Sequence, residues 1–183
     1  MSRPALDLVV LVSGSGSNLQ AILDAIAAGA LDARVRLVVS NKSDAFALER
    51  ARLAGVATRV VSHRDFPGRE SFDQALATIV QHALDTDDRA PLSLVVLAGF
   101  MRLLTPTFLD AFPARVINIH PALLPAFPGT HAQRQALEHG VKVTGCTVHL
   151  VDAGTDTGPI LAQAAVPVLE GDDEATLTTR LLK

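Results

Sequence analysis

The chain has 183 residues, of which 49% are hydrophobic and 19% are charged, and its net charge at pH 7 is −3. This balance is typical of one folded domain, which we expect to span residues 1–183, and it excludes a disordered chain. Because no strongly basic balance is present, we do not expect the chain to bind nucleic acid.

Short apolar runs rich in β-branched residues recur along the first two thirds of the chain, with helical patterns between them. The runs are continuous and do not alternate, which favours strands buried on both faces of a parallel sheet. The predicted strands are Leu6–Ser13, Val35–Asn41, Thr58–Ser62, Leu92–Phe100 and Arg115–His120. The predicted helices are Asn18–Ala28, Asp44–Ala54, capped by Ser43 or Asp44, and Glu70–Leu84. This alternation predicts an α/β fold with a doubly wound, mostly parallel, Rossmann-like sheet.

The remainder of the chain has a different pattern. The stretch HPALLPAFPG (His120–Gly129) contains three prolines and cannot form a regular helix or a central strand. A helix is predicted at Thr130–His139. Two further strands, Gly145–Val151 and Ile160–Val168, are joined by a short glycine-rich segment, which favours an antiparallel pair in the C-terminal part.

Two segments stand outside this organisation. The acidic loop Asp85–Pro91 is expected to be a solvated surface turn. The final residues, DDEATLTTRLLK, have the pattern of a helix but reach Lys183 without a stop signal. We therefore expect the C-terminal helix to be incomplete.

The chain contains a single cysteine, so it cannot form an internal disulfide. No apolar stretch approaches the ~18 residues that a membrane-spanning helix needs, and the N-terminus lacks the features of a secretory signal peptide. We therefore expect a cytoplasmic protein without a membrane partner.

The first predicted strand runs into SGSGSNL, a candidate anion-binding loop. Gly14 and Gly16 match the dinucleotide fingerprint G-x-G-x-x-G, but Leu19 stands in place of its third glycine. Two glycines allow a ligand close to the backbone, and the free N–H groups of a helix N-terminus attract an anion. This suits one phosphomonoester better than a pyrophosphate. The alternative is a tight turn that needs no ligand, with Ser17 as the N-cap.

Asn118 and His120 form a candidate catalytic pair. They are two residues apart at the end of a predicted strand, so their side chains lie on the same side. Asn can donate to an oxygen that gains negative charge, and His can donate or move a proton near neutral pH. Asp156, in the glycine-rich segment, is a carboxylate that could face them. The alternative is that both residues are a polar strand end.

The other histidines are expected to be surface or packing residues. His63, His82 and His139 fall in predicted turns or on helix surfaces, whereas His131 and His149 lie nearer the candidate site. No spacing of His, Cys, Asp and Glu matches a metal site, so we expect no metal. Covalent catalysis is not expected, because no Gly-x-Ser-x-Gly elbow is present and the cysteine has no evident base partner.

Five segments together carry a family resemblance. They are SGSGSNLQAI, VVSNKSDAFALERARLAG, VVLAGFMRLLTPTF, INIHPALLPAFPGTHAQRQAL and GCTVHLVDAGTDTGPILAQAAVPV. On these segments the chain resembles the glycinamide ribonucleotide transformylases, also called phosphoribosylglycinamide formyltransferases, which are folate-dependent enzymes of purine synthesis. The N-x-H-P-x-L-L-P segment is shared by the wider formyltransferase fold, and the Ser-Gly-x-Gly-Ser-Asn segment points to the ribonucleotide branch.

The resemblance implies a role for each group of residues. The phosphate of the ribonucleotide would be bound by Gly16, Ser17 and Asn18. The catalytic residues would be Asn118, His120 and Asp156. The formyl-folate would contact Arg69, Met101, Arg102, Leu103, Leu104, Asn118, Asp152 and Asp156. The Leu124–Pro125 bond would be cis.

The implied reaction transfers the formyl group of 10-formyltetrahydrofolate, the co-substrate, to the amine of glycinamide ribonucleotide. Asn118 and protonated His120 would stabilise the oxyanion, and Asp156 would orient His120 and assist proton transfer. The partners are these two small molecules, and the chain is expected to be a monomer or a homodimer.

The resemblance also marks departures and rivals. In the family the chain continues past the position of Lys183, and a glutamate beyond that position helps to bind the ribonucleotide. The rivals are a formyltetrahydrofolate hydrolase, a methionyl-tRNA formyltransferase, and a non-catalytic nucleotide-binding module if the missing C-terminus abolishes activity. The hydrolase would lack the phosphate loop, and the tRNA enzyme would need an additional RNA-binding domain.

Overall fold

The computed structural model describes residues 6–84 and 92–182. The chain forms two compact units, Met1–Val116 and Ile117–Lys183. The loop predicted at Asp85–Pro91 lies outside the described residues, and the single domain predicted over residues 1–183 stays a prediction. Within the described part, no helix combines the length and the apolar character needed to cross a bilayer.

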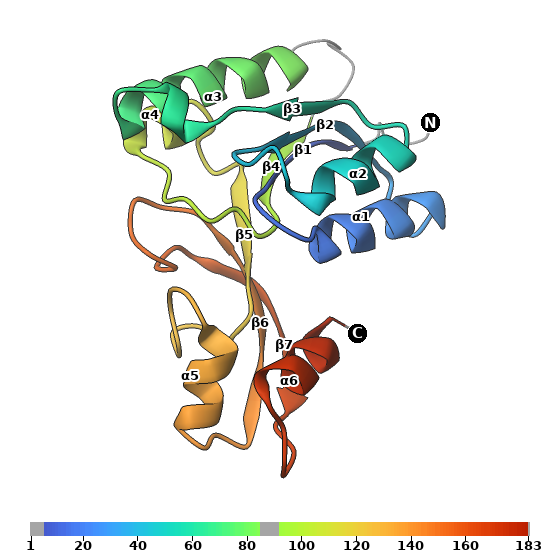
Figure 1. The fold of residues 1–183 in the computed structure, drawn as a ribbon, viewed down its shortest axis with the longest axis vertical. Coiled ribbons are helices and arrows are strands. Elements are labelled where there is room, and N and C mark those ends of the chain that lie inside the picture. Colours follow the sequence, from blue (N-terminus) through green and yellow to red (C-terminus); the bar gives the residue numbers. More distant parts are fainter. Residues whose placement is uncertain (1–5, 85–91, 183) are drawn as a thin grey trace. The chain divides into compact units, whose positions relative to one another are not determined.

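The first unit is built on a parallel sheet (Figure 1). Its strands are β1 (Leu6–Val12), β2 (Ala33–Ser40), β3 (Thr58–Val60) and β4 (Ser93–Leu97). They lie in the order β3-β2-β1-β4, and each neighbouring pair is parallel. Val9, Val10, Leu11 and Val12 have no exposed surface, as the continuous apolar run predicted for a strand covered on both faces.

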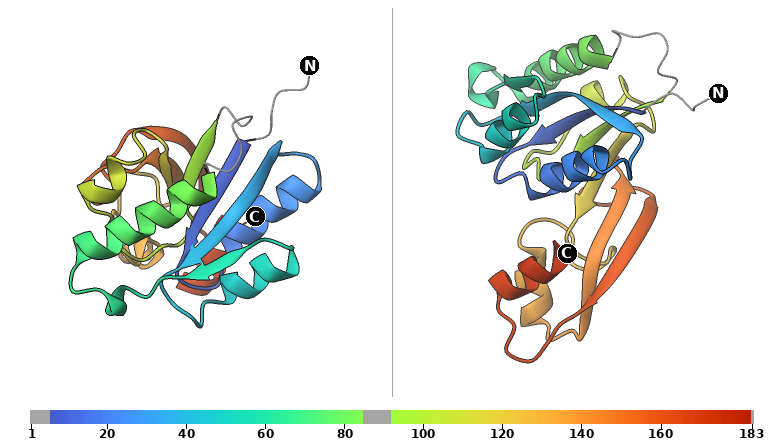
Figure 2. Two further views of the ribbon diagram at one scale, coloured as in Figure 1. Left: turned by 90° about the horizontal axis from the view of Figure 1, so that it is seen from above. Right: turned by 90° about the vertical axis from the view of Figure 1, so that its right-hand side faces the viewer.

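Helices cover both faces of this sheet (Figures 1 and 2). The helix α1 (Ser17–Ala27) packs beside α2 (Phe46–Leu53), and α3 (Arg69–Leu84) packs beside α4 (Pro106–Leu109). The doubly wound arrangement is therefore confirmed for the parallel part of the fold. The short helix α4 and the 3₁₀ turn η1 (His63–Asp65) were not predicted, because each is too short to show a helical period.

The start of α2 differs from the prediction. The helix begins at Phe46 after Ala45, and neither Ser43 nor Asp44 caps it. The reason is tertiary: the N–H of Ala47, which a cap would otherwise satisfy, donates to the carbonyl of Gly14 at 3.0 Å.

The second unit contains the antiparallel strands (Figure 1). They are β5 (Val116–His120), β6 (Val143–Leu150) and β7 (Ile160–Pro167), and β6 pairs antiparallel with both neighbours. The predicted pairing of the last two strands is confirmed. Two helices, α5 (Ala132–Glu138) and α6 (Glu174–Leu181), pack against each other, and Leu177 of α6 is fully buried.

The helix α6 is fixed at its N-terminus by polar contacts. Asp173 is its N-cap, and its carboxylate accepts from the N–H of Thr176 at 2.8 Å while the Thr176 hydroxyl accepts from the N–H of Asp173. Next to the cap, Arg180 donates to both carboxylate oxygens of Asp172, at 2.5 and 2.8 Å. These hydrogen bonds, and one from the N–H of Leu169, hold the pKa of Asp172 well below its usual value of 3.8.

This pair predicts an acid-sensitive contribution to stability. Because the folded-state pKa is depressed, the contribution is present above pH 3.8 and is lost as pH falls below that value. We expect Arg180→Gln to lower the urea midpoint at pH 7, and we expect the difference between the midpoints of variant and wild type to be smaller at pH 3 than at pH 7. Arg52→Gln, which removes an exposed ion pair on α2, is the control. An equal difference at both pH values would contradict the assignment.

Candidate active site

The carboxylate of Asp156 is the centre of a polar cluster in the second unit. Its Oδ2 accepts from the N–H of Gly129 at 2.8 Å and lies 3.3 Å from Nδ1 of His120. Its Oδ1 lies 3.4 Å from Nδ2 of Asn118 and 3.5 Å from Nε2 of His149. The structure therefore brings together the three residues that were predicted to be catalytic, and it adds His149.

Local geometry explains this convergence. Asn118 and His120 lie on β5, where residues two apart face the same side, and the register places Asn118 opposite His149 on β6. Asp156 lies in the loop between β6 and β7 with φ of 55°, a conformation that is rare outside glycine. Gly158 keeps this loop tight, because a Cβ there would lie 1.9 Å from the carbonyl oxygen of Leu150.

His149 was predicted to be a surface or packing residue, but the structure places it beside Asn118 and Asp156. It is 2% exposed, and its Nδ1 lies 2.9 Å from the carbonyl oxygen of Leu150. A carbonyl only accepts, so Nδ1 carries the hydrogen and Nε2 can accept from the amide of Asn118 at 3.1 Å. His149 thereby turns the NH₂ of Asn118 toward itself and Asp156. In the sequence, only the pairing of Asn118 with His149 across the two strands could have identified this residue, and that pairing cannot be assigned until the strand register is known.

His120 is also held at both ring nitrogens. Its Nε2 lies 2.8 Å from the carbonyl oxygen of Phe127, and its Nδ1 faces Asp156. Both partners are acceptors, and an imidazole can donate from both nitrogens only when it is protonated. The ring is buried, at 3% exposure, so this pair of contacts determines its orientation.

The proline-rich stretch supplies two of these contacts, from Phe127 and Gly129, and is itself tied to the sheet. The bond between Leu124 and Pro125 is cis, as the family resemblance implied. The buried hydroxyl of Thr147 on β6 accepts from the N–H of Leu124 at 3.0 Å and donates to the carbonyl of Ala122 at 2.7 Å. These hydrogen bonds satisfy backbone groups of a segment that has no regular secondary structure.

The glycine loop in the first unit is fixed by α2. Ala47 donates to the carbonyl of Gly14, and Nε of Arg50 donates to the carbonyl of Ser15 at 2.9 Å. In a trans peptide the N–H points opposite to the C=O, so the N–H groups that follow these carbonyls point away from α2. Gly16 is the N-cap of α1, with φ of 74°, and no side chain makes a cap hydrogen bond there. Ser17 is the first residue of the helix itself. The alternative of Ser17 as N-cap is therefore wrong.

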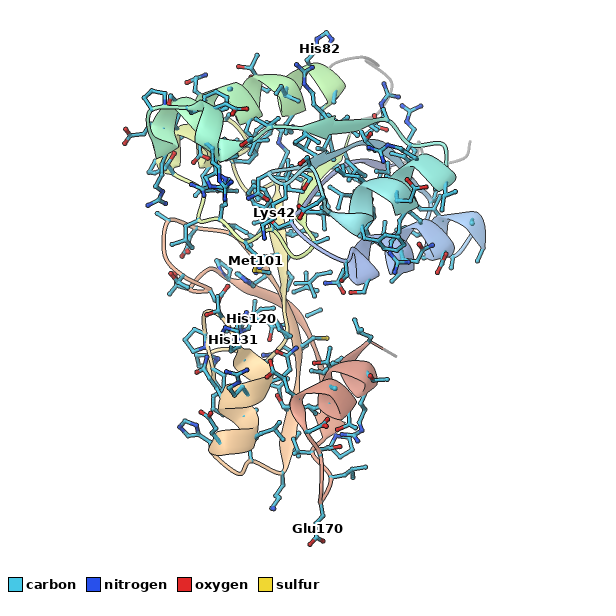
Figure 3. The ribbon with its side chains drawn as sticks, in the orientation of Figure 1. Lys42, His82, Met101, His120, His131 and Glu170 are labelled. Carbon is cyan, nitrogen blue, oxygen red and sulfur yellow. The ribbon has the colours of Figure 1, made fainter. Side chains whose placement is uncertain are left out.

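The residues predicted to contact folate fall in two groups, one in each unit. In the first unit, Arg69 at the start of α3 donates to the carbonyl of Leu103 at 3.1 Å, so it does meet the segment 101–104. Figure 3 labels Met101, which is exposed like Leu103, whereas Leu104 is buried. In the second unit, Asp152 is engaged by the N–H of Gly154 and the hydroxyl of Thr157.

The remaining histidines differ in their surroundings. Figure 3 labels His82 and His131, which are exposed, as is His139. His63 packs edge-on against Phe72, and burial, followed by the charge of Arg102, lowers its pKa. Across residues 6–84 and 92–182, no three His, Cys, Asp or Glu side chains are grouped as metal ligands.

The close packing of Gly16 against Ala47 predicts that adding one methyl group at this position lowers the stability of the fold. A Cβ at Gly16 would lie 2.6 Å from Cβ of Ala47, and the positive φ adds strain. We expect Gly16→Ala to reduce the free energy of unfolding by about 2 kcal/mol or more in urea denaturation. Gly14→Ala is the matched control: nothing lies within 4 Å of its Cβ, so a change within about 0.5 kcal/mol is expected. Equal effects would show that α2 does not constrain the loop.

Comparison with known proteins gives a consistent result. The family model described as formyl transferase matches residues 6–183. The chain is 54% identical over 181 residues to the phosphoribosylglycinamide formyltransferase of Mycobacterium tuberculosis, covering 98% of this chain and 79% of the relative. The crystal structure of glycinamide ribonucleotide transformylase 1 from Symbiobacterium toebii has a TM-score of 0.92 and 54% identity, with 99% of this chain and 82% of that chain covered.

A longer relative is the trifunctional purine biosynthetic protein adenosine-3 of Drosophila pseudoobscura pseudoobscura. It is 50% identical over 183 residues, which is 99% of this chain, but the chain spans only 13% of that relative's length. Family match, sequence identity and fold agree over nearly the whole chain. The chain belongs to the formyl transferase family and, within it, to the phosphoribosylglycinamide formyltransferases.

Proposed function

We propose that this chain transfers the formyl group of 10-formyltetrahydrofolate to the amine of glycinamide ribonucleotide, a step of purine synthesis. The observation that supports it most is the cluster of Asp156 with His120 and Asn118, in a member of this family. The chemistry is direct: the amine attacks the formyl carbon, a C–N bond forms, and the bond from the formyl carbon to the folate nitrogen breaks.

The tetrahedral intermediate carries negative charge on the former formyl oxygen. In the proposed mechanism Nε2 of His120 donates to this oxygen. That hydrogen now faces the carbonyl of Phe127 at 2.8 Å, so the oxyanion has to share or replace this contact. A preorganised donor of this kind contributes about 3–4 kcal/mol in other enzymes.

Asn118 is the second proposed donor. Its Nδ2 has two hydrogens, one directed at His149 at 3.1 Å and one at Asp156 at 3.4 Å. The second contact is long and therefore weak, so this hydrogen is the one available to the oxyanion. His149 holds the amide in the orientation that makes it a donor.

Proton movement completes the reaction. The attacking amine loses a proton, and the folate nitrogen gains one as it leaves. Asp156 is the group proposed to assist, through water, because its carboxylate also holds Nδ1 of His120 at 3.3 Å. No side chain forms a covalent intermediate in this scheme.

The binding roles are proposed for each unit on its own. Gly16, Ser17 and Asn18 bind the phosphate. The bond from Arg50 to the carbonyl of Ser15 directs the N–H of Gly16 away from α2, and Ser17 and Asn18 begin α1, whose first N–H groups have no intrahelical partner. Arg69 and the segment 101–104 contact the formyl-folate. The folate contacts of Asn118, Asp152 and Asp156, a monomeric or homodimeric state and a cytoplasmic location remain predictions.

The first test is a formyl-transfer assay of wild type and Asp156→Asn. We expect wild type to formylate glycinamide ribonucleotide and the variant to lose turnover at least ~100-fold, because the general base and the partner of His120 are gone. Ribonucleotide affinity should stay within about threefold. Glu138→Gln, an exposed carboxyl on α5, is the control.

Two outcomes of this assay count against the proposal. Near-normal turnover in Asp156→Asn removes the role of the carboxylate. Formate release from formyl-folate at an equal rate without ribonucleotide would identify a hydrolase.

The phosphate assignment is tested by the double variant Ser17→Ala and Asn18→Ala. Losing hydrogen bonds to a charged phosphate should weaken ribonucleotide binding about tenfold or more, measured by calorimetry, with the KM for formyl-folate unchanged. Ser43→Ala, an exposed serine of the same unit, should alter neither. Equal weakening of both ligands would count against the assignment.

A further inference from the structure

The segment that follows β4 is irregular but constrained. Residues 98–105 contain no regular secondary structure, and Gly99 adopts a φ of 76° that turns the chain out of the sheet. Met101 and Leu103 are 66% and 55% exposed, although both are large and apolar. A segment with exposed apolar side chains and no strand or helix partner is normally mobile. The hydrogen bonds that fix the backbone of this segment therefore need an explanation.

The start of the segment is held by a buried chain of hydrogen bonds. The N–H of Met101 donates to the hydroxyl of Ser13 at 2.9 Å, and that hydroxyl donates to Oδ1 of Asn41 at 2.6 Å. Ser13 and Asn41 are each 5% exposed and directly follow β1 and β2. The Ser13 hydroxyl has one hydrogen, which it donates to Asn41. Its oxygen is therefore left to accept from the N–H of Met101.

The end of the segment is held by α3. Oδ2 of Asp73, a residue that is 2% exposed, accepts from the N–H of Thr105 at 2.6 Å. One turn earlier on the same helix, Arg69 donates to the carbonyl of Leu103. Between these two contacts, the N–H groups of residues 102–104 have no hydrogen-bond partner among the described residues.

The buried carboxyl group of Asp73 indicates that this position does more than pack α3 against its neighbours. Burying a carboxyl group is costly unless it is well paired, and no ion pair to Asp73 is present in residues 6–84 and 92–182. A helix that only had to pack could place an apolar side chain there. The carboxyl oxygen instead fixes one backbone N–H of the segment at short distance.

We propose that Asp73 and Ser13 are positioning residues for the formyl-folate. They hold the two ends of residues 101–105, so that the free backbone groups and exposed side chains between them are presented in one conformation. Neither residue touches the ligand. The inference rests on the proposed function, because it takes this segment as a folate contact.

The test compares Asp73→Ala, Asp73→Asn and Ser13→Ala with wild type. For each protein, KM for formyl-folate, KM for ribonucleotide, kcat and thermal stability are measured. Tetrahydrofolate binding is measured separately by ligand fluorescence, which is favourable because the chain contains no tryptophan or tyrosine. Ser71→Ala is the matched control: it removes a hydroxyl hydrogen bond at the start of α3 that does not reach the segment.

We expect Asp73→Ala and Ser13→Ala to raise the KM for formyl-folate and the dissociation constant of tetrahydrofolate about tenfold. The KM for ribonucleotide should stay within about twofold. Asp73→Asn should be intermediate, because an amide oxygen can still accept from Thr105, and it also remains informative if Asp73→Ala does not fold. Ser71→Ala should match wild type.

A purely structural role predicts a different pattern. A lower melting temperature with an unchanged folate KM, or with both KM values raised equally, overturns the positioning role alone. A wild-type chain that neither transfers formyl groups nor binds tetrahydrofolate overturns the proposed function as well. The two failures are therefore distinguishable.

Discussion

The second unit is organised around the need to satisfy one carboxylate. Asp156 is mostly removed from water, and four groups from three different parts of the chain surround it: the strand β5, the strand β6 and the proline-rich stretch. A partly buried carboxylate without such partners is unfavourable. The antiparallel register, the tight loop at Gly158 and the bonds from Thr147 all serve to bring these partners within reach.

In the first unit, too, irregular segments are fixed by hydrogen bonds from neighbouring parts of the fold. The glycine loop and the segment 101–105 are both irregular, and in both cases groups from neighbouring elements bind the backbone. Arg50 and Ala47 hold the carbonyls of the glycine loop, whereas Ser13 and Asp73 hold N–H groups of the other segment. Regular elements thus act as supports, and the segments between them carry the candidate binding groups.

Much of the fold could be predicted from patterns. The continuous apolar run at Leu6–Val12 indicated a buried parallel strand, and the periodic spacing in Arg69–Leu84 indicated its helix. The site was harder to predict from the sequence than the fold. Asn118, His120 and Asp156 were identified mainly through family resemblance, since an Asn-x-His pattern alone is weak evidence for a catalytic pair. His149 was missed because cross-strand partners depend on register. At α2 a tertiary hydrogen bond from Ala47 to Gly14 replaces the expected side-chain cap, and at α1 the N-cap is Gly16 and not Ser17.

The sequence by itself determined the fold class, the family and the residues able to act as donors, acceptors and proton carriers. The fold class follows from the periodicity of apolar residues, the family from the resemblance of five segments to known enzymes, and the donors and acceptors from residue type. Only the tertiary structure decided which of those groups meet: that His149 orients Asn118, that Phe127 occupies Nε2 of His120, and that Asp73 holds Thr105. Hydrogen bonds depend on distances of tenths of an ångström between residues far apart in the chain, and no local pattern encodes them.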